Sequence, residues 1–444
     1  MFLKSMWPFL NKHNKKQQKK HLKNNAYDSV EKVYTKASQL TVGMYVTELD
    51  RPWLETSFVF QGFELKTEDD IKAVKNICEY VYIDITKTKK TSNLVAASTQ
   101  TASPTVVDYG APPPKLGTFE KEIYRAGKIY EGTAGVVSNF MEKIARGDGL
   151  DSKLAKEAVA ECVNSVLHSP DAMLWLSQLK NKDEYTAQHS LNVCVLSIVL
   201  GRHLNFSEKD LNITGLCGMM HDMGKMLIPL TILNKPGRLE GDELYTMQSH
   251  TTLGYELLKS SDNMHKSAIE TALIHHERSD GKGYPRQIKP SGISDFAKIV
   301  TIADMYDAIT SDRVYQKGRT HLEAINIMTN MAGTHLDHAL VIKFIESLGV
   351  YPPGCLVEMT NGAIAIVVEC NEKLKLRPKI IIILDEGKNP VQEQQLIDLS
   401  KMVEDGRGNV YTIKGIVRAQ DWNIDSSKYY REGIIHKGFP MRGV

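Results

Sequence analysis

The sequence predicts a multidomain, mainly α protein, in which a small α+β domain precedes a helical core and a β-rich extension follows it. At 444 residues the chain is longer than one ordinary hydrophobic core. Apolar residues recur at helical spacing almost throughout residues 119–348. Residues 87–117 are rich in Lys, Ser, Thr, Ala and Pro, a composition typical of a linker. These observations indicate separate domains rather than one continuous core.

The region before the linker contains a tail and a small domain. Residues 1–31 form a basic tail in which apolar residues precede a run of lysines. A signal peptide carries its charges before its apolar core, so this order does not predict secretion. A solvated tail is favoured, and weak peripheral contact with an anionic membrane surface is the alternative. Residues 32–86 form the α+β domain, with strand patterns at 33–34, 44–46 and 80–83 and a helical pattern at 69–78.

The flexible linker, residues 87–117, is stiffened near its end by Pro112-Pro113-Pro114. The helical domain with its preceding helices spans residues 118–354. Its apolar periodicity predicts helices at 119–146, 152–167, 172–179, 189–204, 211–221 and 240–258. Residues 355–444 form a β-rich C-terminal extension and tail, with predicted strands at 362–368 and 379–384.

Composition narrows the classes of function. Apolar content of 42% and charged content of 24% are typical of a soluble globular protein. A net charge of +2 gives no overall attraction to nucleic acid, and neither DNA nor RNA is an expected partner. Six cysteines lack CxxC spacing, which favours reduced thiols, and no run of about 18 apolar residues predicts a transmembrane helix. The expected location is the cytoplasm.

Histidines and aspartates at the edges of apolar helices predict a metal site. His221-Asp222 ends one apolar helical stretch, His275-His276 ends another, and Asp304 follows buried residues. Divalent transition metals prefer imidazole and carboxylate ligands, and a two-metal site needs a bridging group over about 3.5–4 Å. The set therefore fits a dinuclear metal site. A buried acid such as Asp304 needs a partner or a metal in any case.

Each residue also has a simpler interpretation. A bare His-Asp pair is common by chance. His189 and His250, taken alone, would be ordinary core or surface histidines. The segment from Asp280 to Pro285 could be only a tight turn, because Asp, Gly and Pro are standard turn residues. The functional interpretation is favoured because this turn directly follows His275-His276.

A set of motifs follows one another in a fixed order: His221-Asp222-Met223-Gly224-Lys225, Ile228-Pro229, Leu233-Asn234-Lys235-Pro236-Gly237, His250, His275-His276-Glu277-Arg278, Asp280-Gly281-Lys282-Gly283-Tyr284-Pro285 and Ala303-Asp304-Met305-Tyr306-Asp307-Ala308. Together they resemble the HD-GYP domain, a family of bacterial cyclic di-GMP phosphodiesterases within the broader HD phosphohydrolases. The resemblance covers about residues 180–355. Residues 32–86, with Gly43-Met44-Tyr45-Val46 and Trp53, resemble a small domain of unknown function that often precedes HD-GYP domains.

The resemblance implies roles for individual residues. The implied metal ligands are His189, His221, Asp222, His250, His275, His276 and Asp304, with Asp222 as the bridge. The implied catalytic residues are Asp222, Lys225, which would contact a phosphate, and Asp307, near the metal-bridging water. The implied substrate-binding residues are Lys225, Gly283, Tyr284, Pro285, Arg313 and Lys317.

Two departures from the family pattern matter. Some members carry a glutamate one helical turn before the first histidine, where it helps to bind a third metal. Here that position is Tyr185, with Glu184 beside it, so the expected cofactor is two divalent ions, iron or manganese. After Arg313 the family usually has proline and tyrosine followed by a basic residue. Here Val314, Tyr315 and Gln316 precede Lys317, which weakens the assignment of a second phosphate-binding cation.

The resemblance implies an enzyme, a phosphodiesterase with a dinuclear metal centre that hydrolyses cyclic di-GMP to linear pGpG, GMP or both in bacterial signalling. Two alternatives stay open: a phosphodiesterase of cyclic GMP-AMP, and a non-catalytic receptor for cyclic dinucleotides. Protein partners through the Gly283-Tyr284-Pro285 loop or the N-terminal domain, and a homodimer, are compatible with the resemblance.

Overall fold

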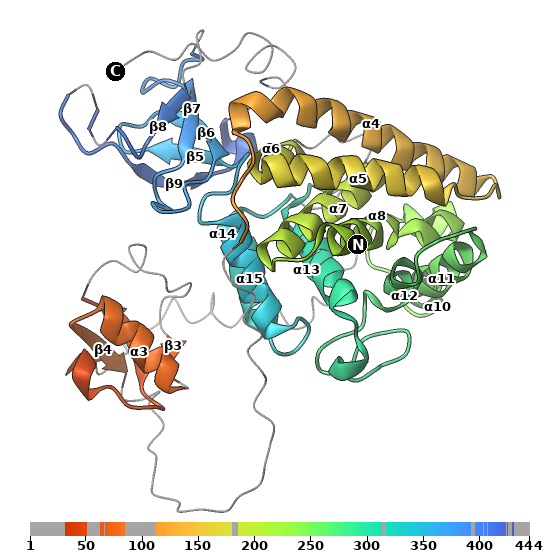
Figure 1. Cartoon of the computed structure of the whole chain (residues 1–444), viewed down its shortest axis with the longest axis horizontal. Coiled ribbons are helices and arrows are strands. Elements are labelled where there is room, and N and C mark those ends of the chain that lie inside the picture. The colour runs from red at the N-terminus through yellow and green to blue at the C-terminus, as the bar shows by residue number, and fades with distance from the viewer. Residues whose placement is uncertain are drawn as a thin grey trace, which may run out of the picture. The chain divides into compact units, whose positions relative to one another are not determined.

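The computed structural model describes residues 32–50, 63–65, 67–84, 112–179, 185–312, 317–391, 396–402, 404–405, 407–422, 424 and 429. The chain divides into two compact units, residues 2–108 and residues 109–444. The basic tail, Trp53, Glu184 and Arg313 lie outside the described residues, as does most of the linker. The N-terminal unit and the larger unit are described separately below (Figure 1).

In the described residues of the N-terminal unit, a four-stranded antiparallel sheet is accompanied by one α-helix. Its elements are β1 (Lys32–Lys36), η1 (Ala37–Gln39), β2 (Tyr45–Leu49), β3 (Phe63–Glu64), α3 (Glu68–Ile77) and β4 (Tyr80–Asp84). The strand order is β1-β4-β2-β3. Thr67 begins α3 with a capping box, because its hydroxyl accepts from the Asp70 N–H while the Asp70 carboxylate accepts from the Thr67 N–H. This confirms the predicted small α+β domain.

The larger unit begins with a long helical hairpin and continues as a helical domain (Figure 1). Its helices are α4 (Phe119–Ala145), α5 (Ser152–His168), α6 (Pro170–Ser177), α7 (Tyr185–His203), α8 (Glu208–Met220), η3 (Met223–Leu227), α9 (Leu230–Leu233), α10 (Asp242–Gln248), α11 (His250–Ser260), α12 (Lys266–Ile274), η4 (Pro290–Gly292), α13 (Asp295–Thr310), α14 (His321–Met331) and α15 (His338–Leu348). Helices α7 and α8 are buried over most of their length, which explains why their sequences are apolar on nearly every side.

Side-chain caps fix where several of these helices start. The side chains of Asp151, Ser207, Ser294 and Asp337 accept from backbone N–H groups in the first turns of α5, α8, α13 and α15. Thr320 and Glu323 form a capping box at the start of α14. Of these capped helices, α8 leads directly into His221-Asp222 and α13 carries Asp304 and Asp307.

One predicted helix differs from the structure. The pattern at 240–258 predicts a single helix, whereas the chain forms α10 and α11 with a break at Ser249. There the backbone closes a tight turn, in which the Ser249 N–H donates to the carbonyls of Tyr245 and Thr246. The break matters because it makes His250 the first residue of α11.

The C-terminal region is a five-stranded antiparallel sheet, as predicted for a β-rich extension. Its elements are β5 (Leu356–Met359), β6 (Ile364–Glu369), β7 (Lys379–Leu384), β8 (Leu396–Asp398), β9 (Ile413–Val417) and η5 (Ala419–Trp422). The strand order is β8-β7-β6-β5-β9. Val357, Ala365, Val367 and Ile380 are fully buried in its core.

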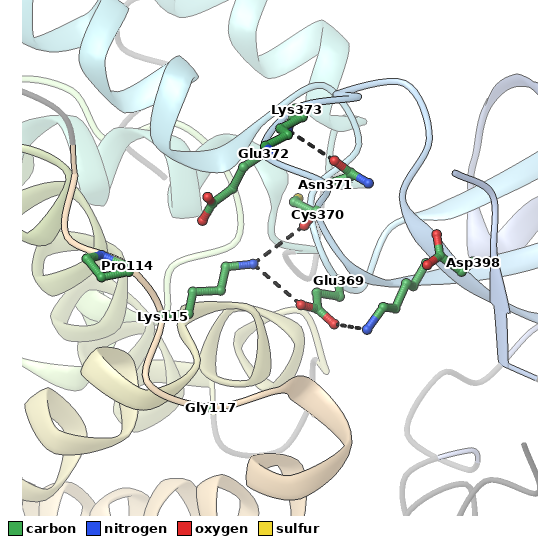
Figure 2. A pocket seen from close by; sticks show the side chains of 10 residues that line it. Pro114, Lys115, Gly117, Glu369, Cys370, Asn371, Glu372, Lys373 and Asp398 are labelled. Carbon is green, nitrogen blue, oxygen red and sulfur yellow. Dashed lines mark hydrogen bonds and ion pairs between the residues drawn. The ribbon is translucent and has the colours of Figure 1, made fainter. Parts of the chain in front are cut away.

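A polar network joins this sheet to the helices. Lys115 forms an ion pair with Asp171, at the start of α6, and its Nζ lies 3.7 Å from Glu369 Oε1 at the end of β6. Figure 2 shows Lys115 extended toward Glu369 and the Cys370 carbonyl beside a pocket of about 410 Å³. Lys379 then pairs with both Glu369 and Glu120 of α4. The sheet is therefore held against the first helices by charged side chains.

Candidate metal centre

Seven side chains far apart in the sequence form a His/Asp cluster in the helical domain. The side chains form two groups, and within each group the potential ligand atoms all lie within 4.8 Å of one another. The first group is His189, His221, Asp222 and Asp304, and the second group is Asp222, His250, His275 and His276. The sequence analysis named all seven, and the structure brings all seven together.

Local backbone geometry explains how His221 and Asp222 can face the same space. Successive residues on a helix point about 100° apart. His221 caps the C-terminus of α8, and Asp222 has already left the helix, with φ −108° and ψ 7°. His221 Nε2 therefore lies 3.1 Å from Asp222 Oδ2. His221 and Asp222 can therefore face the same space because the helix ends between them.

Asp222 lies between the two groups, and each of its oxygens faces a different one. Oδ2 lies 3.4 Å from His189 Nε2 and 3.1 Å from His221 Nε2. Oδ1 lies 3.4 Å from His250 Nε2 and 3.7 Å from His275 Nε2. This is the arrangement expected of a carboxylate that bridges two cations.

The orientation of the histidine rings fits metal binding. The Nδ1 atoms of His221, His250 and His275 lie 2.7–3.1 Å from backbone carbonyls one turn earlier, and His189 Nδ1 lies 2.7 Å from Asp307 Oδ2. Carbonyls and carboxylates only accept, so each Nδ1 carries the proton and donates. Each Nε2 faces the cluster, where a lone pair can bind a cation.

Two buried atoms of the cluster support this fit. Among the described residues, His221 Nε2 and Asp222 Oδ1 have no hydrogen-bond partner, although both side chains are almost fully buried. A buried polar atom without a partner costs free energy, and a metal ion is one explanation for its retention. The donor set, imidazole with carboxylate, suits transition metals such as iron and manganese.

Burial and neighbouring charges set the protonation of the ligands. Burial lowers the pKa of His250 to about 3, and Asp222 only partly offsets this effect. Burial, with His275 and His250 nearby, also holds the pKa of His276 well below its usual range. Both imidazoles are therefore neutral near pH 7, the form that can bind a metal.

The pKa values of Asp222 and His189 move in opposite directions. Burial would raise the pKa of Asp222, but His221 and Lys225 outweigh it and hold that pKa well below its usual range. His189 has its pKa raised well above normal, because hydrogen bonds to Asp222, Asp304 and Asp307 outweigh burial. A metal ion at the first group would need His189 in its neutral form, with the lone pair of Nε2 free.

The loop that follows His275-His276 packs against the cluster. The Tyr284 ring stacks on His276, with centroids 4.8 Å apart and planes inclined by 26°. A Cβ on Gly283 would lie 2.4 Å from the Glu277 Cα, so only glycine permits this close approach. Tyr284 and Pro285 are joined by a cis peptide bond. The structure thus brings Gly283 and Tyr284 beside His276 of the His/Asp cluster, while Pro285 is exposed.

Glu277 shapes this loop, a role that the sequence analysis did not assign. Its buried carboxylate accepts from the backbone N–H groups of Arg286, Gln287 and Ile288 at 2.6–3.2 Å. One carboxylate therefore organises three successive amides. Its position directly after two ligand histidines was the available signal.

The remaining predicted site residues lie in several environments. Lys225 pairs with Asp222 and keeps one fifth of its side chain exposed. Asp307 is buried and contacts His189. Lys317 is exposed. Arg313 lies outside the described residues, and Tyr185 begins α7 without a described side chain.

Comparison with known proteins agrees with this arrangement. Residues 174–340 match the family described as HD domain, residues 33–155 a domain of unknown function, and residues 356–403 a KOW domain associated with HD domain. The chain is 33% identical over 389 residues to a cyclic di-GMP phosphodiesterase of Pseudomonas aeruginosa, covering 87% of this chain and 92% of that protein.

Two further relatives cover less. A 3'3'-cGAMP-specific phosphodiesterase of Vibrio cholerae is 32% identical over 171 residues, which is 38% of this chain and 37% of that protein. A solved HDG"Y"P protein from Bdellovibrio bacteriovorus aligns at 18% identity and a TM-score of 0.42, covering 71% of this chain and 98% of that chain. Because the likeness to the Pseudomonas aeruginosa protein extends over most of both chains, this chain belongs to the HD-GYP family of HD-domain proteins.

No helix in the described part of the chain combines the length and the apolar character needed to cross a membrane.

Proposed function

We propose that this protein is a metal-dependent phosphodiesterase that hydrolyses cyclic di-GMP to linear pGpG, GMP or both. The observation that carries the proposal is Asp222, whose two oxygens face two separate groups of ligands. The relative that is similar over most of both chains is named as a cyclic di-GMP phosphodiesterase, which favours this substrate.

The seven residues of the His/Asp cluster would hold two divalent ions, iron or manganese. Such ions supply Lewis-acid polarisation of a phosphoryl oxygen and activation of water. Asp222 would bridge them, and the four histidines with Nδ1 hydrogen bonds would present Nε2 without reorganisation. Asp304 would complete the first group and His276 the second.

The chain's own cations would bind the substrate's phosphates. Lys225 is held beside Asp222 yet remains partly exposed, so its ammonium can contact a phosphoryl oxygen and stabilise charge that develops there. Gly283, Tyr284 and Pro285 would form one wall of the substrate site. Arg313 and Lys317 are proposed to contact the second phosphate.

The proposal includes a cytoplasmic location. The six cysteines form no disulfide, and four of them are buried. Free thiols of this kind are typical of a reducing compartment. Binding of protein partners through the Gly283-Tyr284-Pro285 loop and formation of a homodimer are part of the same proposal.

Cyclic GMP-AMP is a second candidate substrate, because the Vibrio cholerae relative is named for specificity toward it. A competition assay separates the two. The protein, loaded with iron or manganese, is incubated with equal amounts of cyclic di-GMP and cyclic GMP-AMP, and the products are resolved by chromatography. Faster loss of cyclic di-GMP is expected. Faster loss of cyclic GMP-AMP would reassign the substrate, and binding of either without product would indicate a receptor.

A further inference from the structure

A buried chain of hydrogen bonds connects helix α4 to His189. The Tyr130 hydroxyl donates to Asn192 Oδ1 at 2.6 Å, and Asn192 Nδ2 donates to Asp307 Oδ1 at 2.9 Å. Asp307 Oδ2 in turn accepts from His189 Nδ1 at 2.7 Å and from the Ser311 hydroxyl at 3.2 Å. Tyr130, Asn192, Asp307 and His189 are all at most 8% exposed. Water is therefore a poor substitute for any of these contacts.

The carboxylate of Asp307 determines which atom donates in each hydrogen bond of this network. An ionised Asp307 offers only acceptors, so Asn192 must present its NH₂ group to it. The Asn192 carbonyl oxygen then faces Tyr130, whose hydroxyl must donate. His189 must likewise donate from Nδ1, which leaves Nε2 as the atom that faces Asp222 and Asp304 at 3.4 and 3.1 Å. One arrangement of protons satisfies every member.

This hydrogen-bond network begins at Tyr130, outside the segment that matches the HD domain. Tyr130 lies in α4, before residues 174–340, whereas Asn192, His189 and Asp307 lie inside them. Asn192 lies three residues after His189 on α7, so both side chains face the same side of that helix. Helix α4 therefore supplies the last donor of a network that the HD-domain segment does not complete alone.

We propose that Tyr130 is a positioning residue for the first group of the His/Asp cluster, acting through Asn192 and Asp307 to fix the ring orientation and tautomer of His189. This inference rests on the proposed metal-binding function. Residues that hydrogen-bond to a metal ligand fix its orientation, and their loss typically lowers metal affinity by 10–100-fold. Tyr130, two hydrogen bonds beyond Asp307, acts at the lower end of that range.

The test measures metal binding directly, apart from turnover. Manganese is titrated into the metal-free, full-length protein and the variant Tyr130→Phe, which keeps the ring and removes only the hydroxyl. The affinity for one of the two bound ions should fall by about 10-fold. The other, held by the second group, should keep its affinity within about twofold, because His250 and His275 orient on backbone carbonyls instead.

Tyr306→Phe is the matched control. It also removes a buried hydroxyl, but one that lies 2.9 Å from His321 Nδ1, and it should leave both manganese affinities unchanged. In an Asn192→Ala background, Tyr130→Phe should have less than about a twofold further effect, since residues of one network are not additive.

Three results would overturn the inference. Tyr130→Phe could leave the affinity for both ions unchanged, or it could lower both affinities equally. In the Asn192→Ala background, Tyr130→Phe could lower the affinity by as much as it does in the unsubstituted protein. Turnover of cyclic di-GMP is measured on the same samples. A protein that binds two ions, shows the selective loss and hydrolyses nothing would refute the proposed function while leaving the role of Tyr130 intact.

Discussion

At the scale of single residues, burial keeps His321 neutral. His321 is 6% exposed; its Nδ1 accepts from the Tyr306 hydroxyl and its Nε2 donates to the Gly349 carbonyl. Burial lowers the pKa of His321 to about 4. This residue is separate from the His/Asp cluster, so its titration reports on the fold rather than on metal binding.

The consequence is a defined pH dependence of stability. Between about pH 6.5 and pH 4 the unfolded chain binds a proton at His321 that the folded chain does not bind, so the free energy of unfolding falls as the pH is lowered. The contribution is about 3 kcal/mol when fully developed. In His321→Gln, urea unfolding of the metal-free protein at pH 7 and pH 4.5 should show a smaller loss than in the unsubstituted protein. An equal loss in both proteins would contradict the assignment.

Residue type and chain order made the members of the His/Asp cluster predictable. The paired histidines His275-His276 at a helix end stand out in the sequence, and the ordered motifs add His221-Asp222 to them. The roles of Tyr130 and Asn192 were not predictable in this way, because a tyrosine and an asparagine within these two helices have no special spacing. Their contact joins positions 62 residues apart and appears only in three dimensions.

At the scale of elements, close packing of η3 against α11 sets the distance between Asp222 and His250. A Cβ on Gly224 would lie 2.0 Å from the His250 carbonyl oxygen and 2.5 Å from the Gly254 nitrogen, both backbone atoms. Neither can move without shifting α11. Gly224 is thus the residue that lets the 3-10 helix after Asp222 approach the helix that begins with His250.

Gly224→Ala should separate these elements. We expect a loss of about 1–3 kcal/mol in the free energy of unfolding, as for other overpacked sites, and weaker manganese binding. Gly135→Ala is the control, because a Cβ at Gly135 in α4 meets nothing within 4 Å and alanine favours a helix. That variant should be as stable as the original or more so. Equal stability of the two variants, measured by urea unfolding, would contradict the packing argument.

Many of the helices were predictable from apolar periodicity, since α4 and α5 present long regular patterns. The break between α10 and α11 was not, because Ser249 is compatible with a helix and residues on both sides of it keep helical spacing. A turn closed by backbone hydrogen bonds leaves no distinct signal in the sequence.

At the scale of the whole molecule, a few buried charges hold the C-terminal sheet on the helical domain. Asp171 has a side chain only 5% exposed, pairs with Lys115 and accepts from the Cys370 N–H at 3.3 Å. The strands were predictable from runs such as Ile380–Leu384, but this attachment was not, since it depends on one lysine near the end of the linker.

Removing that lysine should weaken the attachment. Lys115→Met leaves Asp171 buried beside Glu369 without its cation, and we expect a loss of about 3 kcal/mol in the free energy of unfolding. Lys121→Met, on α4, should change it by less than about 0.5 kcal/mol. Thermal unfolding followed by circular dichroism provides the measurement. No difference between the two variants would show that the network does not hold the sheet.

In the proposed function, Asp222 would bridge two metal ions in an enzyme that hydrolyses a cyclic dinucleotide. The most direct test compares the unsubstituted protein with Asp222→Asn, both loaded with manganese and analysed for metal content, in turnover of cyclic di-GMP. The account predicts two ions per chain and hydrolysis in the first, and fewer ions with at least about a 100-fold loss of turnover in the second. Near-equal turnover by an Asp222→Asn sample of known metal content would contradict it.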